Sequence, residues 1–329
     1  MRVKILNEAE IRSCVGMNAE ALEIVSEGFA KLALEQVTVP PIMRIDVHDN
    51  NGEVDIKTAY IHGLENFAIK IASGFLDNRA LGLPTGSGMM VLISAKTGRP
   101  EAVLLDNGYL TDVRTGIAGA IAAKHLVPKN IRTAGVIGSG MQARYQIRGL
   151  KLVRQFREVL VFGIQKEQVG QYVQEMTQEL GVPVKAAESA EQVVRESDMV
   201  VTTTPSRDPF LKAEWLHPGL HITCMGSDAE HKQELYPEVF AKADLIACDR
   251  VSQVFRLGEL HHALEAGVVT DRTSVIELGE IITGKVSGRT DDQQITICDL
   301  TGVGVQDTQI ARLAFKKAAK LGLGLEIDD

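Results

Sequence analysis

The stretch AGVIGSGMQA, from Ala134 to Ala143, decides how this chain folds. Its first four residues are small or apolar and predict a short buried strand, which is followed by Gly138-Ser139-Gly140 and a long helical pattern. Gly138 permits a sharp turn, and Gly140 lets backbone N–H groups approach an anionic ligand. Ala143 stands where a small residue allows close helix–strand packing. This order predicts a dinucleotide-binding site with the pyrophosphate at the helix N-terminus; the alternative is a plain glycine-rich turn.

Regular alternation of strand-like and helical patterns surrounds this turn. In order, the strand-like runs are AGVIG, EVLVFG, VKAA, DMVVTTT, LHITCMG, ADLIACD and ITICDL. One helix is expected near Glu234–Ala241. Another, over Thr111–Lys124, is rich in small residues and suits tight packing against a neighbour or a ligand. The alternation predicts an α/β fold with a Rossmann-type, doubly wound parallel sheet.

The first third of the chain has a different pattern. Helical periodicity is followed by short β-like runs, with a hairpin turn at Lys96–Arg99, and these runs predict an antiparallel sheet with helices beside it. An amphipathic helix over Gln306–Leu321 follows the last predicted strand and is expected to return to this first lobe. We therefore predict a discontinuous α/β lobe of residues 1–115 with 305–329, and a dinucleotide-binding domain of residues 116–304.

Composition excludes several classes of partner. Of the 329 residues, 35 are Lys or Arg and 43 are Asp or Glu, so the net charge is −8, and no basic run exceeds Lys316-Lys317. Nucleic acid and anionic membrane surfaces are therefore not expected partners. The four cysteines lack C-x-x-C spacing, and three lie in strand-like runs, which predicts buried core residues and no metal site. No signal segment or membrane span is evident, so a cytoplasmic location is expected.

Polar residues follow four of the predicted parallel strands. The first group is the glycine turn, and the others are Thr202–Ser206, Met225–Asp228 and Asp299–Gly304. Ligands collect at the carboxyl ends of strands in open α/β sheets. Each group alone is also compatible with a capped turn, but four groups on one sheet edge favour a ligand site.

Three cations in and next to the first lobe are candidates for binding an anion. Arg44 lies in IMRIDV, Lys70 in FAIKIAS and Arg114 in the small-residue helix. The pattern around Lys70 alone favours the solvated face of a strand, and the alternative is a pocket that holds an anion. Each arginine fits either a fork for a carboxylate or a surface salt bridge.

Together these residues resemble the ornithine cyclodeaminase/mu-crystallin family. The resemblance runs from PIMRIDV through LTDVRT, the glycine turn and TTTPSRDPF to HITCMGSDAEHKQEL and the closing GVQD. The runs PIMRIDVHDNNGEVDIKTAYI and LLDNGYLTDVRT are most similar to the ectoine-utilisation cyclodeaminase branch. The resemblance implies a homodimer, in which a Rossmann domain binds NAD(P) and the other lobe serves substrate binding and dimerisation.

The resemblance also implies roles for individual residues. Arg44 and Arg114 match the arginines for the substrate carboxylate, Lys70 matches the catalytic lysine, and Asp228 matches the acid that handles protons at the reacting amine. Asp55 lies near the position of a substrate-side Glu. The positions that match cofactor contacts are Thr115, Gly138, Gly140, Met141, Gln142, Thr203, Pro205 and Met225.

The reaction and the cofactor stay partly open at this stage. The second Rossmann strand ends in Phe162-Gly163-Ile164-Gln165-Lys166, with neither an acid for a ribose hydroxyl nor an Arg for a 2′-phosphate, so NAD is favoured and NADP is not excluded. The implied activity is cyclodeamination of a small diamino acid through oxidation at Cα, loss of ammonia and reduction of the cyclic imine. The alternatives are an imine or ketimine reductase, an amino-acid dehydrogenase and a non-catalytic NADPH-binding protein.

Overall fold

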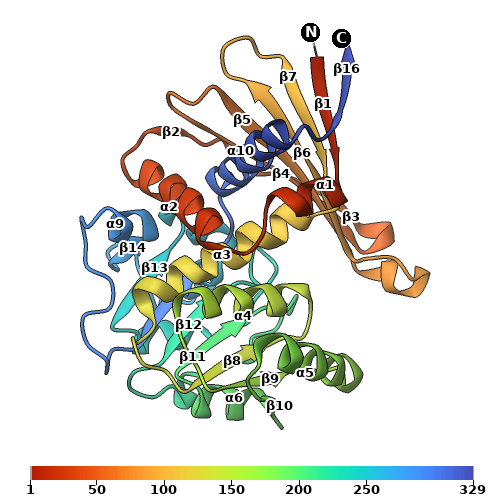
Figure 1. The fold of residues 1–329 in the computed structure, drawn as a ribbon. Helices are drawn as coiled ribbons and strands as arrows, with labels where there is room; N and C mark the ends of the chain where they lie inside the picture. The colour runs from red at the N-terminus through yellow and green to blue at the C-terminus, as the bar shows by residue number, and fades with distance from the viewer. Residues whose placement is uncertain (1, 329) are drawn as a thin grey trace. The chain divides into compact units, whose positions relative to one another are not determined.

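The computed structural model describes residues 2–328 and divides the chain into two compact units (Figure 1). The first unit contains the residues up to Arg114 together with those from Val303 onwards, and the second is Thr115–Gly302. Helix α3 (Tyr109–Leu126) begins in the first unit and continues in the second. No helix within residues 2–328 has the length and apolar character that a membrane span requires.

Eight strands form the sheet of the second unit, and all their pairings are parallel. Their order is β10-β9-β8-β11-β12-β15-β13-β14. The predicted doubly wound parallel sheet is therefore confirmed. From β8 the chain runs outward to β9 and β10 and then returns to β11 beside β8, so the order reverses there. The bounds are β8 (Thr133–Ile137), β9 (Glu158–Phe162), β10 (Val184–Ala186), β11 (Met199–Thr202), β12 (His221–Cys224), β13 (Leu245–Cys248), β14 (Val275–Glu277) and β15 (Thr296–Asp299).

Helices separate these strands along the chain. The small residues of α3 allow another helix to pack closely against it. A Cβ on Gly149 of that helix would lie 2.4 Å from the carbonyl oxygen of Gly116 in α3. The helix expected near Glu234–Ala241 begins instead at Pro237 and is a 3₁₀ helix, η4, since Glu234 is buried in the preceding loop. The elements are α4 (Met141–Val153), α5 (Lys166–Leu180), α6 (Ala190–Glu196), η3 (Ala213–Trp215), η4 (Pro237–Lys242), α7 (Val251–Leu257), α8 (Glu259–Glu265) and α9 (Leu278–Ile282).

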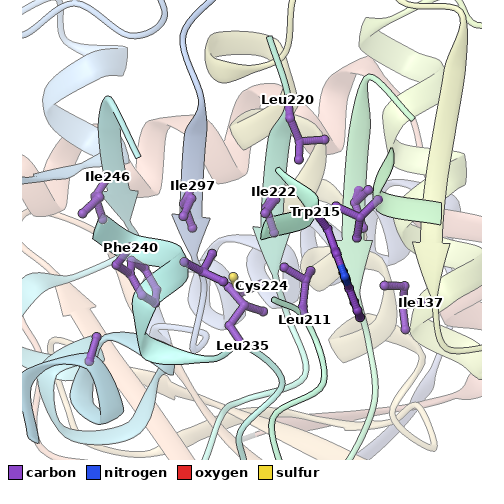
Figure 2. Packing of buried hydrophobic residues seen from close by; sticks show 14 of the residues in the cluster. Ile137, Leu211, Trp215, Leu220, Ile222, Cys224, Leu235, Phe240, Ile246 and Ile297 are labelled. Atoms are coloured by element: carbon purple, nitrogen blue, oxygen red, sulfur yellow. The ribbon is translucent and has the colours of Figure 1, made fainter. Parts of the chain in front are cut away.

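Hydrophobic residues cover both faces of this sheet, as a buried parallel sheet requires. Ile222, Ile297 and Ile246 stand side by side on β12, β15 and β13 and point to one face, where Trp215 and Phe240 pack (Figure 2). A second cluster includes Val136, Val161, Tyr172 and Met176. The prediction of buried cysteines is confirmed, since Cys14, Cys224, Cys248 and Cys298 are all free and buried.

The sheet of the first unit is also eight-stranded, with the order β16-β1-β7-β6-β5-β4-β2 and with β3 paired to β4. The hairpin at Lys96–Arg99 is confirmed, and Gly98 takes φ +72° there. The antiparallel pairing predicted for the short β-like runs is confirmed, and β1, which was not predicted, adds a parallel pairing with β7. The strands are β1 (Arg2–Asn7), β2 (Val37–Thr38), β3 (Met43–Val47), β4 (Gly52–Ile61), β5 (Asn66–Phe75), β6 (Gly86–Ser94), β7 (Pro100–Leu105) and β16 (Leu325–Asp328), and short 3₁₀ helices are η1 (His48–Asn50) and η2 (Leu76–Leu81).

One face of this sheet is covered by α10 (Gly304–Leu321), and α2 (Ala19–Ala33) packs on α10 in turn; α1 (Glu8–Cys14) lies against β1 and β7 (Figure 1). Thr308 ties α10 to two strands: its Oγ1 donates to the Ala59 carbonyl at 2.7 Å and accepts from the Ala68 N–H at 3.1 Å. The expectation of an amphipathic helix is wrong for the first three turns, since every residue from Gly304 to Ala314 is buried. Several polar residues there bond groups inside the protein, such as Thr308 to the Ala59 carbonyl and Arg312 to Asn66 Oδ1.

The opposite face of the first sheet carries a row of apolar side chains. Ile69, Val91 and Val103 are register neighbours on β5, β6 and β7, and all three are only half-buried. Leu325 and Ile327 of β16 are 65% and 46% exposed. Together these five residues define an apolar sheet face.

Candidate active site

The candidate residues fall into two groups, one in each unit, and the second unit holds the predicted cofactor positions. Gly138 follows β8 directly and takes φ +110°, and a Cβ there would lie 2.4 Å from Thr203 Oγ1. A residue other than Gly would therefore be strained and would collide with the end of β11. Thr203 donates its backbone N–H to the Ile137 carbonyl at 2.9 Å, which holds the ends of β8 and β11 together.

Gly140 is different, because a Cβ on it would meet nothing within 4 Å. Its φ of −80° is open to any residue, so neither packing nor backbone strain requires glycine there. Gly140 is the N-cap of α4 and offers no side chain to the first N–H groups of that helix. Open space beside a helix N-terminus fits a pyrophosphate, which needs close approach to backbone N–H groups.

Arg144 bonds the backbone carbonyl groups of this glycine turn. It was not among the residues predicted from the sequence. Its Nη1 donates to the carbonyl oxygens of Ser139 and Gly140 at 2.7 and 3.1 Å, and its guanidinium also pairs with Glu175. The carbonyl groups of the turn are thereby bonded within the protein. The sequence signal for this contact was the position of Arg144, four residues after Gly140 in the predicted helix.

The remaining predicted cofactor positions lie on α3, in the first turn of α4 and after the strands β11 and β12. Met141 is 56% exposed and Gln142 follows it in the first turn of α4. Thr115 is buried on α3, and its carbonyl accepts from Gln146 Nε2 at 3.0 Å. Pro205 is exposed after β11, and Met225 follows β12, where its N–H donates to the Thr202 carbonyl at 3.0 Å. The four predicted polar groups therefore follow four adjacent strands, β8, β11, β12 and β15, on one sheet edge.

The structure at the end of β9 does not distinguish between NAD and NADP. Gln165 is the N-cap of α5 but makes no side-chain cap, and both Gln165 and Lys166 are exposed. Neither an acidic residue nor an arginine stands at this strand tip.

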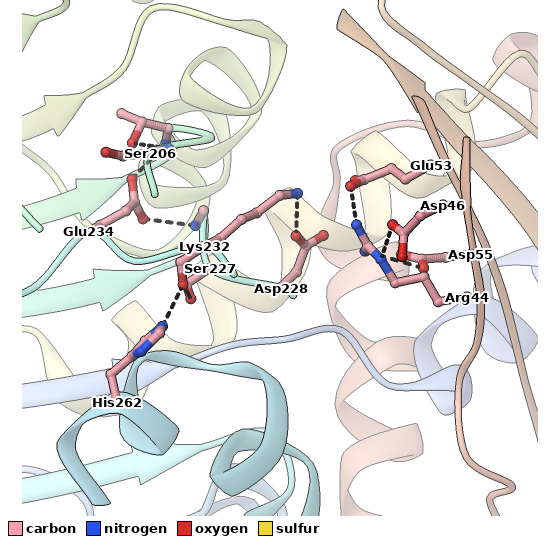
Figure 3. Close-up of polar contacts among 12 residues, drawn as sticks. Arg44, Asp46, Glu53, Asp55, Ser206, Ser227, Asp228, Lys232, Glu234 and His262 are labelled. Carbon is pink, nitrogen blue, oxygen red and sulfur yellow. Dashed lines mark hydrogen bonds and ion pairs between the residues drawn. The ribbon is translucent and has the colours of Figure 1, made fainter. Parts of the chain in front are cut away.

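Asp228 lies in the loop after β12, close to the ammonium group of Lys232. Lys232 Nζ is 2.8 Å from Asp228 Oδ1, and the Asp228 side chain is 36% exposed (Figure 3). The Lys232 carbonyl accepts from Ser227 Oγ at 2.6 Å and from His262 Nε2 at 2.9 Å, so the loop around Asp228 is held from two sides. Lys232 was not among the residues predicted from the sequence.

A buried ionic cluster occupies the first unit and contains two predicted residues. Lys70 on β5 and Arg114 on α3 both contact Asp307 of α10: Lys70 Nζ lies 3.2 Å from Oδ2, and Arg114 Nε lies 2.9 Å from Oδ1. Arg114 Nη1 also donates to Gln306 Oε1 at 2.9 Å. All four side chains are buried. The structure thus brings Lys70 and Arg114 together around a carboxylate that the sequence interpretation did not select, although it quoted the GVQD run.

Lys70 is 1% exposed, so the expectation of a solvated strand face from the local pattern is wrong. Burial, together with the positive charges of Arg114 and Lys57, lowers the pKa of Lys70 to about 7 despite the opposing effect of Asp307. Lys57 is the direct cross-strand neighbour of Lys70 on β4 and is buried too. Burial also raises the pKa of Asp106 to about 6 at the end of β7. A lysine in this state can exchange a proton near neutral pH.

Arg44 and Asp55 are register partners on β3 and β4, with Arg44 Nη1 3.5 Å from Asp55 Oδ1 (Figure 3). Arg44 also pairs with Glu53, and its Nε lies 3.0 Å from Asp46 Oδ1. Burial lowers the pKa of Arg44, but Glu53 and Asp55 raise it more, so the net pKa lies above its usual value. The guanidinium thus has three carboxylate neighbours within its own unit, which is the salt-bridge alternative that the sequence left open.

One group of side chains outside both clusters has metal-ligating types. His261, His262 and Glu265 on α8 place one possible ligand atom each within 4.8 Å of the others. Both imidazoles already bond backbone carbonyls, His261 Nδ1 to Gly258 at 2.8 Å and His262 Nε2 to Lys232 at 2.9 Å. These bonds give both rings a structural role.

Comparison with known proteins identifies relatives over the full length. The model of the ornithine cyclodeaminase/mu-crystallin family matches residues 1–321. An uncharacterized cyclodeaminase of Sinorhizobium fredii is 49% identical over 323 residues, which is 98% of this chain and 98% of that protein.

Solved structures are similar over the whole chain as well. A Thermococcus litoralis Δ1-pyrroline-2-carboxylate reductase in complex with NADH and L-proline has a TM-score of 0.94 and 30% identity, covering 99% of this chain and 100% of its own. An archaeal alanine dehydrogenase dimer with bound NAD has a TM-score of 0.92 and 34% identity, covering 100% and 99%.

Proposed function

The chain belongs to the ornithine cyclodeaminase/mu-crystallin family, and from this premise we propose that it is an NAD-dependent enzyme acting on the Cα–N bond of a small amino or imino acid. The observation that carries this proposal is the buried cluster of Lys70, Arg114 and Asp307. Two buried cations around one carboxylate are a poor way to stabilise a fold. With Lys70 protonated the cluster has an excess positive charge, which suits the carboxylate of an amino acid.

The proposed roles follow from these positions. Arg114 binds the α-carboxylate, and Arg44 assists it by exchanging one of its present carboxylate partners, of which Asp55 at 3.5 Å is one. Lys70, with its pKa of about 7, moves a proton at the reacting nitrogen. Asp228 acts as general base. We assign substrate binding and dimerisation to the first unit, and cofactor binding to the second unit, which includes Thr115.

The residues after β8, β11 and β12 fit a dinucleotide, since Gly140 leaves open space at the N-terminus of α4. Thr115, Gly138, Gly140, Met141, Gln142, Thr203, Pro205 and Met225 would hold it. When bound, the nicotinamide supplies hydride chemistry at the substrate Cα. We favour NAD, because no arginine stands after β9 and because both similar solved structures contain NAD(H); NADP remains the alternative.

Cyclodeamination of a diamino acid is the leading reaction. In net terms the substrate loses ammonia and closes to a cyclic amino acid, and the dinucleotide ends in the oxidation state in which it began. The similarity to the Sinorhizobium cyclodeaminase supports this form, and the carboxylate of Asp55 is suited to a second amine. A role of this reaction in ectoine utilisation is a further prediction, which rests on the sequence resemblance alone.

The second candidate is a single redox step, either imine reduction or amino-acid dehydrogenation. It is favoured by the similarity to a pyrroline-carboxylate reductase and an alanine dehydrogenase at 30% and 34% identity. A binding protein without turnover, the third candidate, needs no buried lysine with a pKa near neutrality.

An assay of ammonia and nicotinamide absorbance on the purified protein separates these candidates. The substrates are ornithine, lysine, 2,4-diaminobutyrate, alanine and cyclic imino acids, each with NAD(H) and NADP(H), and the Lys70→Met variant serves as control. Ammonia release without net NADH identifies cyclodeamination, whereas a net change in NADH identifies the single redox step. Cofactor binding with no turnover in any combination would contradict the proposal of an enzyme.

We also propose a homodimer. In this dimer the apolar sheet face packs against the same face of a second copy of the chain. Contiguous apolar surface that is open to solvent marks interfaces between proteins. The similar archaeal alanine dehydrogenase is a dimer, which supports the same assembly.

A further inference from the structure

Glu234 is a fully buried carboxylate that bonds two loops at once. Its Oε2 accepts from Thr202 Oγ1 at 2.6 Å and from the Gly226 N–H at 3.0 Å, while its Oε1 accepts from the Thr204 N–H at 2.6 Å. Thr204 lies in the loop after β11, residues 203–206, and Gly226 lies in the loop after β12, residues 225–228. One side chain therefore joins both loops (Figure 3).

The backbone around Glu234 is fixed by a second buried carboxylate. Glu259 at the start of α8 accepts from the N–H groups of Glu234 and Leu235 at 2.7 and 3.1 Å. On the other side Gly226 presses against Glu234, since a Cβ on Gly226 would lie 2.5 Å from the Glu234 carboxyl carbon. The glycine thus permits the close approach that the 3.0 Å hydrogen bond needs.

The burial of Glu234 next to Glu259 is poorly explained by a contribution to the stability of the fold. Burial raises the pKa of Glu234 to about 7, even though the hydrogen bonds from Thr202 and Thr204 lower it. Burial likewise raises the pKa of Glu259 well above its usual value, and the Glu234 charge adds to that rise. Two adjacent buried carboxylates carry a desolvation cost that an apolar pair would avoid.

The two loops that Glu234 joins contain residues with proposed roles. Thr203 and Pro205 lie in the first loop, and Met225 and Asp228 lie in the second. We propose that Glu234 is a positioning residue that fixes the loops 203–206 and 225–228 relative to each other, and so aligns cofactor-binding Thr203, Pro205 and Met225 with the general base Asp228. This inference rests on the proposed function.

The test compares Glu234→Gln with Asp198→Asn in the full-length protein. The first variant keeps the volume but turns an NH₂ group toward at least one of three donors. Asp198 is the control: it is half-buried, and its Oδ2 accepts from the Arg132 and Thr133 N–H groups at 2.6 and 2.9 Å, at the opposite ends of β8 and β11 from the proposed cofactor contacts.

Amide hydrogen exchange of both proteins without cofactor is the first readout. We expect Glu234→Gln to speed exchange in residues 203–206 and 225–228 together, by about tenfold or more, and Asp198→Asn to leave both loops unchanged. NADH titration is the second readout, where Glu234→Gln raises the Kd by about tenfold and Asp198→Asn by less than about twofold. A shift of kcat without any change of Kd or of loop exchange would overturn the positioning role, as would equal effects of the two variants.

The readouts also separate this inference from the proposed function. If the unaltered protein fails to bind NADH, the proposed function fails, while loop exchange still reports whether Glu234 joins the loops. If Glu234→Gln does not fold, Glu234→Asp keeps the charge but withdraws the carboxylate by one methylene group. Exchange in both loops should then still rise together, and protection retained in both would overturn the inference.

Discussion

Lys232 Nζ lies 2.8 Å from Asp228 Oδ1, four residues earlier in the same loop. The Lys232 side chain is only 13% exposed, and its backbone carbonyl is bonded by Ser227 and His262. Both ends of this lysine are therefore fixed, and its ammonium group orients the carboxylate that we assign as general base.

We expect Lys232→Met to lower kcat by about tenfold, because Asp228 loses its orienting partner, while the Kd for NADH stays within about twofold. Lys232→Arg keeps a cation at this position and should restore part of the rate. Steady-state kinetics and NADH titration of both variants check this. If Lys232→Met and Lys232→Arg lose activity equally, the charge of Lys232 is not what matters.

The change Asp228→Asn removes the base without changing the size of the side chain. We expect it to reduce kcat by about a hundredfold or more and to leave NADH affinity nearly intact. The same titration and turnover assays measure both quantities. Equal loss of turnover and of NADH binding would sink the role assigned to Asp228.

Lys70 makes a prediction about stability and pH. Its pKa is about 7 in the folded protein, below the ordinary 10.5, so between these values the unfolded chain binds the extra proton and the folded one does not. The free energy of unfolding therefore rises with pH from about 7 to about 10 through this group, and below pH 7 both states are protonated and the contribution is flat.

Urea unfolding at pH 7 and pH 9 measures this contribution. Relative to Lys70→Met, the unaltered protein should gain roughly 1 to 3 kcal/mol between the two pH values. The exposed Lys129 provides a control, since Lys129→Met should follow the unaltered protein. A constant difference between the unaltered protein and Lys70→Met at both pH values would contradict the neutral buried lysine.

Gly138 and Gly140 should respond differently to the same substitution. Gly138→Ala is strained at φ +110° and collides with Thr203, so it should lower the free energy of unfolding by about 2 kcal/mol or more. Gly140→Ala meets nothing in the protein and should cost less than about 1 kcal/mol, yet raise the Kd for NADH by about tenfold. Denaturation and NADH titration of the pair check this, and unchanged NADH affinity in Gly140→Ala would remove the reason given for that glycine.

The apolar sheet face predicts the oligomeric state. Val91 lies at its centre, between Ile69 and Val103, so Val91→Lys should shift the protein from dimer to monomer at micromolar concentration. Light scattering coupled to size-exclusion chromatography measures the mass. The control Ile164→Lys changes a 90% exposed residue in the other unit and should remain dimeric. A monomeric unaltered protein would refute the dimer itself.

The sequence predicted the second unit well because its signals are local. A short apolar run followed by Gly138 and Gly140 predicts a strand and a turn from the residues themselves, and regular alternation implies parallel pairing. The first unit was harder, since β1 pairs with β7, with Lys4 opposite Ala102, and β16 joins from the far end of the chain.

The candidate site shows the same division. Residues at strand ends, such as Thr203 and Asp228, can be found from their position in the pattern. The environment of Lys70 could not, because its neighbour Asp307 lies on α10 and only the folded chain brings the two within 3.2 Å. Glu234 was missed for a similar reason: it resembles an exposed residue of a helix start, whereas its partners Thr204 and Gly226 lie on other loops.

Isotope transfer from a Cα-deuterated substrate tests the central claim of hydride chemistry at Cα most directly. Each amino acid that turns over is supplied with deuterium at Cα, and mass spectrometry follows the label. We predict that deuterium is retained in the cyclic product for cyclodeamination, or is found on the nicotinamide for a single redox step. Deuterium lost to solvent, with none in the product or the cofactor, would show proton abstraction instead and would contradict the account.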